Sequence, residues 1–102
     1  MPTKKWFGLR DLEKKHGPIT LGLFLSAFRE AEGLSQAEYA KKLGLSRANL
    51  CDIEKGRRIA SPERAAKIAK AMGVPETALI QLALQDKLRE VNLDYKVELK
   101  IA

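Results

Sequence analysis

Apolar residues recur every three to four positions through most of this chain, which is the spacing of a helix with one buried face. Most of these segments begin at a serine or threonine, whose hydroxyl can accept hydrogen bonds from the free N–H groups of a first helical turn. Glycines follow several of the segments, and glycine tolerates the left-handed conformation that ends a helix. These signals predict helices over about residues 20–32, 35–43, 46–55, 61–72 and 75–91.

The two ends of the chain break this pattern. Residues 9–16 predict a short extra helix, which Gly17 and Pro18 bring to an end. In residues 93–102, LDYKVELKIA, apolar and charged positions alternate, which predicts a β-strand with one buried face. The apolar positions of this strand are Tyr95, Val97, Leu99 and Ile101.

A single strand leaves its backbone N–H and C=O groups without partners, so this one needs a neighbour. Three neighbours are open: the same strand of a second copy, a short strand at residues 3–7, or the sheet edge of a different protein. We favour the second copy. The chain then divides into an N-terminal extension at residues 1–19, a helical domain at 20–92, and a C-terminal strand at 93–102 for dimerisation or partner binding.

The helix expected at 75–91 carries more apolar surface than one core contact requires. Either the N-terminal extension or another chain must cover the surplus, and we favour another chain. The two apolar stripes are Leu79, Leu82 and Ala83 on one side, and Ile80, Leu84, Leu88 and Val91 on the other.

The charge of the chain is unevenly distributed. Its net charge is +6, and all of the excess lies between Lys41 and Lys70, because the remaining residues hold acids and bases in equal number. Such an asymmetry fits a surface that binds a polyanion, although an ordinary solvated face would have the same composition.

Composition also excludes several classes of protein. The sequence has no apolar run long enough to span a membrane, no secretory signal, and a single cysteine, so we expect a cytoplasmic protein without membrane association. One histidine and one cysteine cannot form a zinc site or a Cys–His nucleophile. Paired carboxylates in a motif and a phosphate-binding glycine loop are also missing, so we expect no catalytic residue, no metal, no cofactor and no enzymatic activity.

The most informative stretch is LSQAEYAKKLGLSRANLCDIEKGRR, residues 34–58. Two short helices are joined through residues 44–46, and so short a connection makes them cross steeply. In the second helix Leu50 and Ile53 face inward, which is the arrangement of a helix-turn-helix whose second helix enters the DNA major groove. An ordinary helical hairpin is the alternative, but the basic charge argues against it. The residues left facing outward are Arg47, Ala48, Asn49 and Asp52.

The motifs LSQAEYAKKLG, LS-x-x-x-L-x-x-IE-x-G and SPERAAKIAKAMGVP together resemble the Xre/Cro phage-repressor family over about residues 20–80. The resemblance implies an all-α, five-helix, lambda-repressor-like domain. It also implies a repressor that binds double-stranded operator DNA as a homodimer. The chain resembles HigA-type antitoxins in size, layout and charge as well, so an antitoxin that neutralises a toxin protein is the alternative function.

The family's base-reading positions correspond here to Arg47, Ala48, Asn49 and Asp52. Base chemistry agrees, because an arginine can bind guanine, an asparagine adenine, and an alanine the methyl group of thymine. Asp52 has two open interpretations. It either accepts from a cytosine amine or pairs with a neighbouring basic side chain on the helix surface.

The resemblance also implies contacts to the DNA backbone, where Lys55 replaces the family's usual asparagine and would bind phosphate by charge alone. Arg29 and Glu54 match a pair that the family uses as a structural salt bridge between helices. Cys51, in the recognition helix, is a small packing residue rather than a redox switch, because no second thiol accompanies it. The expected backbone contacts are Gln36, Ser46, Lys55, Arg57 and Arg58.

Overall fold

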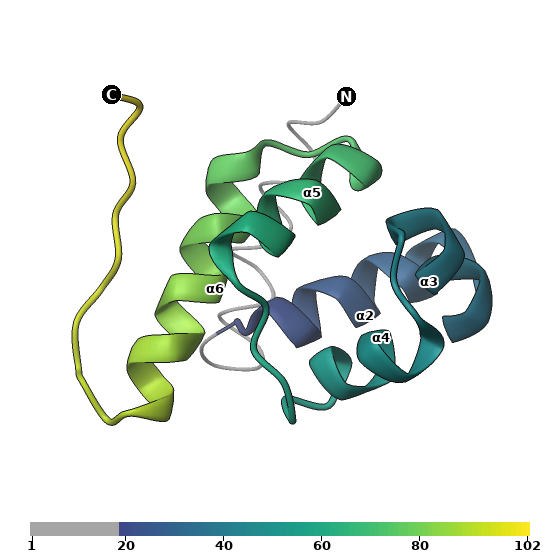
Figure 1. Cartoon of the computed structure of the whole chain (residues 1–102), viewed down its shortest axis with the longest axis horizontal. Coiled ribbons are helices and arrows are strands. Elements are labelled where there is room, and N and C mark those ends of the chain that lie inside the picture. The colour runs from purple at the N-terminus through teal and green to yellow at the C-terminus, as the bar shows by residue number, and fades with distance from the viewer. Residues whose placement is uncertain (1–18) are drawn as a thin grey trace.

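The structure is a computed structural model that describes residues 19–102. This part of the chain is helical, and the helices are packed into one body (Figure 1). Each begins and ends within one residue of its expected position. The expected helix at 9–16 and the possible strand at 3–7 lie outside the described residues. The helices are α2 (Leu21–Glu32), α3 (Gln36–Leu43), α4 (Arg47–Glu54), α5 (Pro62–Met72) and α6 (Glu76–Glu90).

Side-chain caps explain where these helices begin. The hydroxyls of Thr20, Ser35, Ser46 and Ser61 each accept a hydrogen bond from a backbone N–H in the first turn of the following helix. At Ser35 the bond is reciprocal, because the Glu38 carboxylate accepts from the Ser35 backbone N–H at 2.9 Å. Such boxes satisfy two otherwise free donors. The four caps predicted from the sequence are therefore confirmed.

The core lies where all of the described helices meet. α5 packs along α6, α2 contacts α4 and α6, and α3 contacts α4 and α5. Tyr39 and Phe24 are completely buried there, and the ring of Phe24 stacks on that of Phe28 with centroids 4.5 Å apart. Burial of the Tyr39 phenol raises its pKa. The large aliphatic side chains buried with them are Ile19, Leu21, Leu25, Leu50, Ile53, Ile68 and Leu79.

The expected C-terminal strand is not formed. Residues 93–102 are extended and run back beside α6, as the yellow segment of Figure 1 shows, but residues 19–102 contain no β-strand. The side-chain amide of Gln85 supplies what a neighbouring strand would. Its Nε2 donates to the Tyr95 carbonyl at 2.6 Å, and its Oε1 accepts from the Val97 N–H at 2.8 Å. These two hydrogen bonds pair only one carbonyl and one N–H of the segment, so they do not replace the ladder that a strand requires.

The apolar positions of this C-terminal segment are unequally covered. Val97 and Leu99 are half-buried, whereas the side chains of Tyr95 and Ile101 remain 69% and 90% exposed. The two stripes of α6 differ in the same way. Leu79, Leu82 and Ala83 are buried, but the other stripe is at most half-buried, and its last member, Val91, is exposed.

Candidate nucleic-acid interface

The turn between α3 and α4 is built from local backbone bonds. Gly44 has a left-handed conformation with φ 71°, which is easily adopted without a side chain. The N–H of Leu45 then donates to the Ala40 carbonyl at 2.8 Å, and Ser46 immediately caps α4. This tight connection fixes the angle at which α4 leaves α3.

The two sides of α4 have different environments. Leu50 and Ile53 are buried against the other helices, while Arg47 and Ala48 in the first turn are exposed. Asn49 and Asp52 are half-buried at the edge of the exposed side. Within residues 19–102 the guanidinium of Arg47 has no partner, so its donors are available to an outside acceptor.

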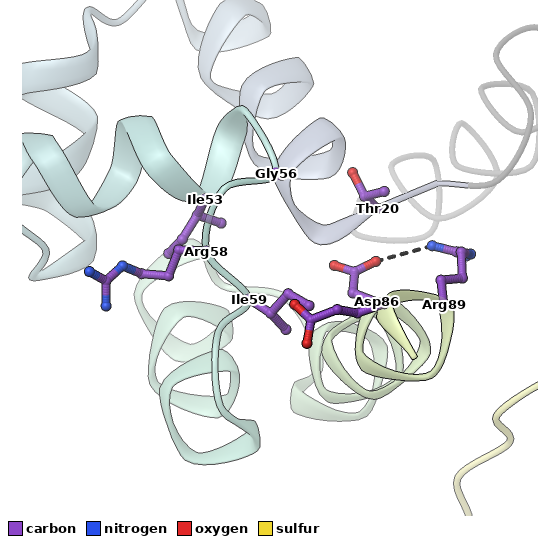
Figure 2. A pocket seen from close by; sticks show the side chains of 9 residues that line it. Thr20, Ile53, Gly56, Arg58, Ile59, Asp86 and Arg89 are labelled. Atoms are coloured by element: carbon purple, nitrogen blue, oxygen red, sulfur yellow. Dashed lines mark hydrogen bonds and ion pairs between the residues drawn. The ribbon is translucent and has the colours of Figure 1, made fainter. Parts of the chain in front are cut away.

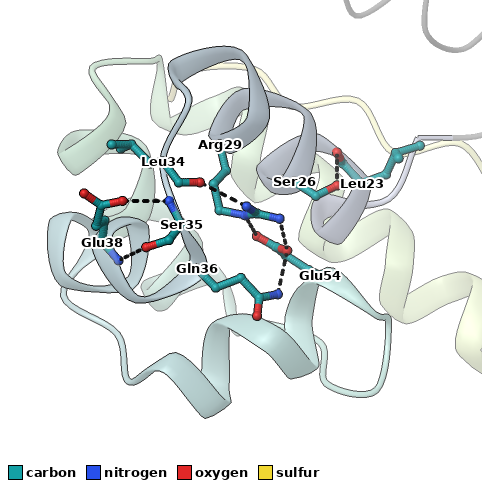
Figure 3. A network of polar contacts seen from close by, with 8 residues as sticks. All are labelled: Leu23, Ser26, Arg29, Leu34, Ser35, Gln36, Glu38 and Glu54. Atoms are coloured by element: carbon teal, nitrogen blue, oxygen red, sulfur yellow. Dashed lines mark hydrogen bonds and ion pairs between the residues drawn. The ribbon is translucent and has the colours of Figure 1, made fainter.

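A polar network joins α4 to α2 and α3 (Figure 3). Arg29 donates to the Glu54 carboxylate through Nε at 2.9 Å and through Nη2 at 3.2 Å. Its third contact, from Nη1 to the Leu34 carbonyl, is 3.0 Å long. The hydrogen bond to Glu54 raises the pKa of Arg29. With side-chain exposures of 17% and 5%, Arg29 and Glu54 form a largely buried ion pair between α2 and the end of α4.

Gln36 belongs to the same network. Its Nε2 donates to Glu54 Oε1 at 3.1 Å, so the first residue of α3 braces the last residue of α4. The expected phosphate contact of Gln36 stays a prediction, and it would have to use the amide atoms that Glu54 does not occupy.

The loop after α4 folds back onto the helix that it leaves. The N–H groups of Arg57 and Arg58 both donate to the Asp52 carbonyl, at 2.8 and 3.2 Å. Lys55, Arg57 and Arg58 are exposed, so the loop directly after α4 presents three cations to solvent. Cys51 is half-buried, and its sulfur lies 3.7 Å from Arg57 Nη2.

Asp52 is already paired in the free chain. The Arg57 guanidinium contacts its Oδ1 through Nε at 3.0 Å and through Nη2 at 2.9 Å. Of the two interpretations of Asp52, the pairing with a neighbouring basic side chain matches this geometry. The contact with a cytosine amine stays a prediction. The hydrogen bond to Asp52 raises the pKa of Arg57.

Comparison with known proteins decides the family. A family model described as helix-turn-helix matches residues 25–79, more than half of the chain. The chain belongs to the helix-turn-helix family. The resemblance to the Xre/Cro type, inferred from its motifs, is confirmed, and residues 25–79 form a DNA-binding domain of the kind found in transcriptional regulators.

Two curated relatives support this assignment. The immunity repressor protein of Bacillus phage phi105 is 31% identical over 84 residues, which cover 82% of this helix-turn-helix protein. The chain spans only 58% of that repressor's length. An uncharacterised helix-turn-helix-type transcriptional regulator of Methanocaldococcus jannaschii is 46% identical over 50 residues, 49% of this chain and 76% of the relative. No solved structure matches the chain.

Two residues that sequence reasoning missed set the position of the helix-turn-helix. Gly22, in α2, lies so close to the end of α4 that a Cβ there would overlap the Ile53 carbonyl oxygen and lie 2.9 Å from that of Glu54. A glycine inside a helical pattern is the available signal for such a close approach.

The second missed residue is Asp86. Its Oδ2 accepts from the Leu21 N–H at 3.0 Å, which ties α6 to the first turn of α2. Its Oδ1 accepts from Arg89 at 3.1 Å, as Figure 2 shows. Burial raises the pKa of Asp86 despite both contacts. An isolated acid on a helix gives no sequence signal for this long-range contact.

A pocket of about 310 Å³ lies between the start of α2, the loop after α4 and the end of α6 (Figure 2). Its charged lining residues are Arg58, Asp86, Arg89 and Glu90, two of each sign, so it is a poor site for a phosphate. No group of three potential metal ligands occurs in the part of the chain that the structure describes. The helices of that part are also too short or too polar to cross a membrane.

Proposed function

We propose that this protein is a transcriptional repressor that binds an operator in double-stranded DNA as a homodimer, with α4 in the major groove. The proposal is carried by Arg47, which is exposed on the first turn of α4 and has no partner within residues 19–102, and by the three cations in the loop that follows. Membership in the helix-turn-helix family and the immunity repressor named among its relatives support it. No enzymatic activity is part of the proposal.

Within this proposal the residues divide into two groups. Arg47 binds guanine, Asn49 binds adenine and Ala48 contacts a thymine methyl group, which gives sequence choice. The DNA backbone is bound by Gln36, Ser46, Lys55 and Arg58, which give affinity and salt dependence. Lys55 and Arg58, the two basic residues of this group that follow α4, suit a contact with phosphate because they are exposed and have no carboxylate partner within residues 19–102.

Dimerisation through the C-terminal segment completes the proposal. Helix-turn-helix proteins read two half-sites with two copies of one helix. The backbone of residues 98–102 makes no hydrogen bond to any described residue, and Tyr95 and Ile101 are exposed. The same segment of a second copy would pair with these backbone groups and cover the two exposed side chains. The strand predicted from the sequence would form at that contact.

The same open backbone supports a second candidate function. An extended segment with free N–H and C=O groups can add to the sheet edge of a different protein. A toxin bound in this way would make the chain an antitoxin that regulates its own operon. Co-purification with a protein encoded beside it, lost when residues 93–102 are deleted, would support this alternative.

The test of DNA binding is selection of duplexes from a random pool, followed by titration of the selected and random duplexes. We expect selection of a two-part site. Arg47→Ala should weaken binding to that site by about 1–3 kcal/mol and relax one base position, while Lys55→Ala should weaken all duplexes alike. No enrichment of any sequence would refute the proposal, and equal losses on both duplexes for Arg47→Ala would refute its role.

A further inference from the structure

The pair between Asp52 and Arg57 is unusual for the loop in which it occurs. The loop contains three cations, but only Arg57 contacts a carboxylate among the described residues. The fold arranges this contact through the backbone, because the Arg57 N–H donates to the carbonyl of Asp52 itself. The side chain of Arg57 contacts two residues of α4, Asp52 and Cys51.

Stability does not account for this pair. The side chains of Arg57 and Asp52 are 57% and 33% exposed. Ion pairs as exposed as this contribute little to folding, since water screens them and two long side chains lose conformational freedom. The buried pair of Arg29 and Glu54 is different, because it holds helices together.

Phosphate binding does not account for it either. A cation that binds the DNA backbone acts through its charge, and a carboxylate beside it cancels that charge and repels phosphate. Lys55 and Arg58 are free of such a partner within residues 19–102. If Arg57 had the same task, Asp52 would only reduce its affinity.

The geometry suits a base contact instead. Asp52 lies one helical turn beyond Ala48 and Asn49, on the same side of α4. Its Oδ1 binds the Nε and Nη2 edge of the Arg57 guanidinium. Arginine has five N–H donors in one plane. Nη1 has no partner within residues 19–102, and the second contact of Nη2 is with the Cys51 sulfur at 3.7 Å, which is a weak acceptor. The end formed by Nη1 and Nη2 can therefore donate to the O6 and N7 acceptors of a guanine once a base displaces that sulfur.

We propose that Arg57 reads a guanine next to the bases read by the first turn of α4, and that Asp52 is the positioning residue that orients it. This inference rests on the proposed function and deepens it. It replaces a phosphate contact for Arg57 with a specificity contact. It also gives Asp52 a role through Arg57 rather than through a cytosine.

The experiment uses the selected duplex and a set in which each base pair is replaced in turn. Arg57→Ala should lose discrimination at one base pair, by about five- to hundredfold. Asp52→Asn should lose part of the discrimination at the same base pair. The double variant should be no worse there than Arg57→Ala alone, because Asp52 acts through Arg57.

Two matched variants separate orientation from charge. Arg57→Lys keeps the charge but not the planar fork, so it should lose discrimination as Arg57→Ala does while retaining the salt dependence of binding. Arg58→Ala, in the same loop, should weaken all duplexes equally and reduce the slope of log affinity against log salt by about one. Asp52→Glu should restore part of the discrimination that Asp52→Asn loses.

Four results would overturn the inference. Arg57→Ala could weaken all duplexes equally, which would make Arg57 a phosphate contact. Asp52→Asn could strengthen binding to all duplexes without changing base preference, which would make Asp52 a repulsive surface charge. If the unmodified protein prefers no sequence, the proposed function fails as well, whereas preference for a site that these variants leave unchanged refutes the inference alone.

Discussion

The Glu54 carboxylate receives hydrogen bonds from both Arg29 and Gln36, and it is almost entirely removed from water. Removing its cationic partner leaves a buried charge without compensation. We expect Arg29→Met to lower the free energy of unfolding by about 3–5 kcal/mol, measured by urea denaturation. Lys42→Met breaks the exposed pair with Glu32 and is the matched control, with an expected loss of at most about 1 kcal/mol. Equal losses would contradict a buried, stabilising pair.

Asp86 should give the stability of the protein a specific pH dependence. Burial raises its pKa in the folded state, so between the ordinary carboxyl range near pH 4 and that raised pKa the folded chain binds more protons than the unfolded one. Stability contributed by the site therefore falls as pH rises through this window. Asp86→Asn cannot ionise, so the stability of the unmodified protein relative to this variant should decrease from pH 4 upward in urea titrations. If the stabilities of the two proteins depend on pH in the same way, the raised pKa of Asp86 is contradicted.

Single residues differ in how far the sequence revealed them. Ser35 and Ser46 were predictable because a cap acts within one turn of its own helix. The partners Arg29 and Glu54 were predictable only through the family resemblance. The pairing of Asp52 with Arg57 required the fold, because it depends on a loop that turns back along α4.

At the scale of elements, α4 depends on the glycine of α2 against which it lies. Gly22→Ala would place a methyl group onto the Ile53 carbonyl, so the helices must separate. We expect a stability loss of about 1–3 kcal/mol, and a further loss of DNA affinity because α4 moves relative to α3. Thermal unfolding and duplex titration measure the two effects.

The control for this change is Gly33→Ala at the end of α2. Gly33 has φ 70°, and no atom of the described residues lies within 4 Å of the position that a Cβ would take, so alanine there strains the backbone by about 1–2 kcal/mol without moving α4. Its DNA affinity at a temperature where it is folded should equal that of the unmodified protein. If both variants bind DNA equally well, the contact at Gly22 does not position α4.

The prediction of the helices within residues 19–102 was correct and that of the C-terminal strand was wrong, for one physical reason. A helix satisfies its own backbone, so periodicity and caps specify it locally. A strand needs the backbone of a neighbouring strand. The alternation in residues 93–102 indicates only that an extended segment there would have one apolar and one charged face, and does not show that a neighbour is present. In this chain the side-chain amide of Gln85 takes the place of a neighbouring strand for two backbone groups of the segment.

At the scale of the whole molecule, the exposed side of the C-terminal segment predicts self-association. Deleting residues 93–102 should convert a dimer into a monomer in sedimentation experiments, and should abolish cooperative binding to two half-sites. Glu98→Ala alters an exposed position between the apolar ones and should leave the dimer intact. A truncated chain that still sediments as a dimer would place the interface elsewhere.

The close seating of α4 on α2 has a consequence for attempts to transplant this binding surface. α4 has only eight residues, and a helix of that length is unstable in water by itself. A synthetic peptide of residues 46–58 would therefore be unstructured, and its arginines would sample many orientations. Transfer of residues 46–58 to another protein scaffold must therefore include the α2 backbone that supports α4.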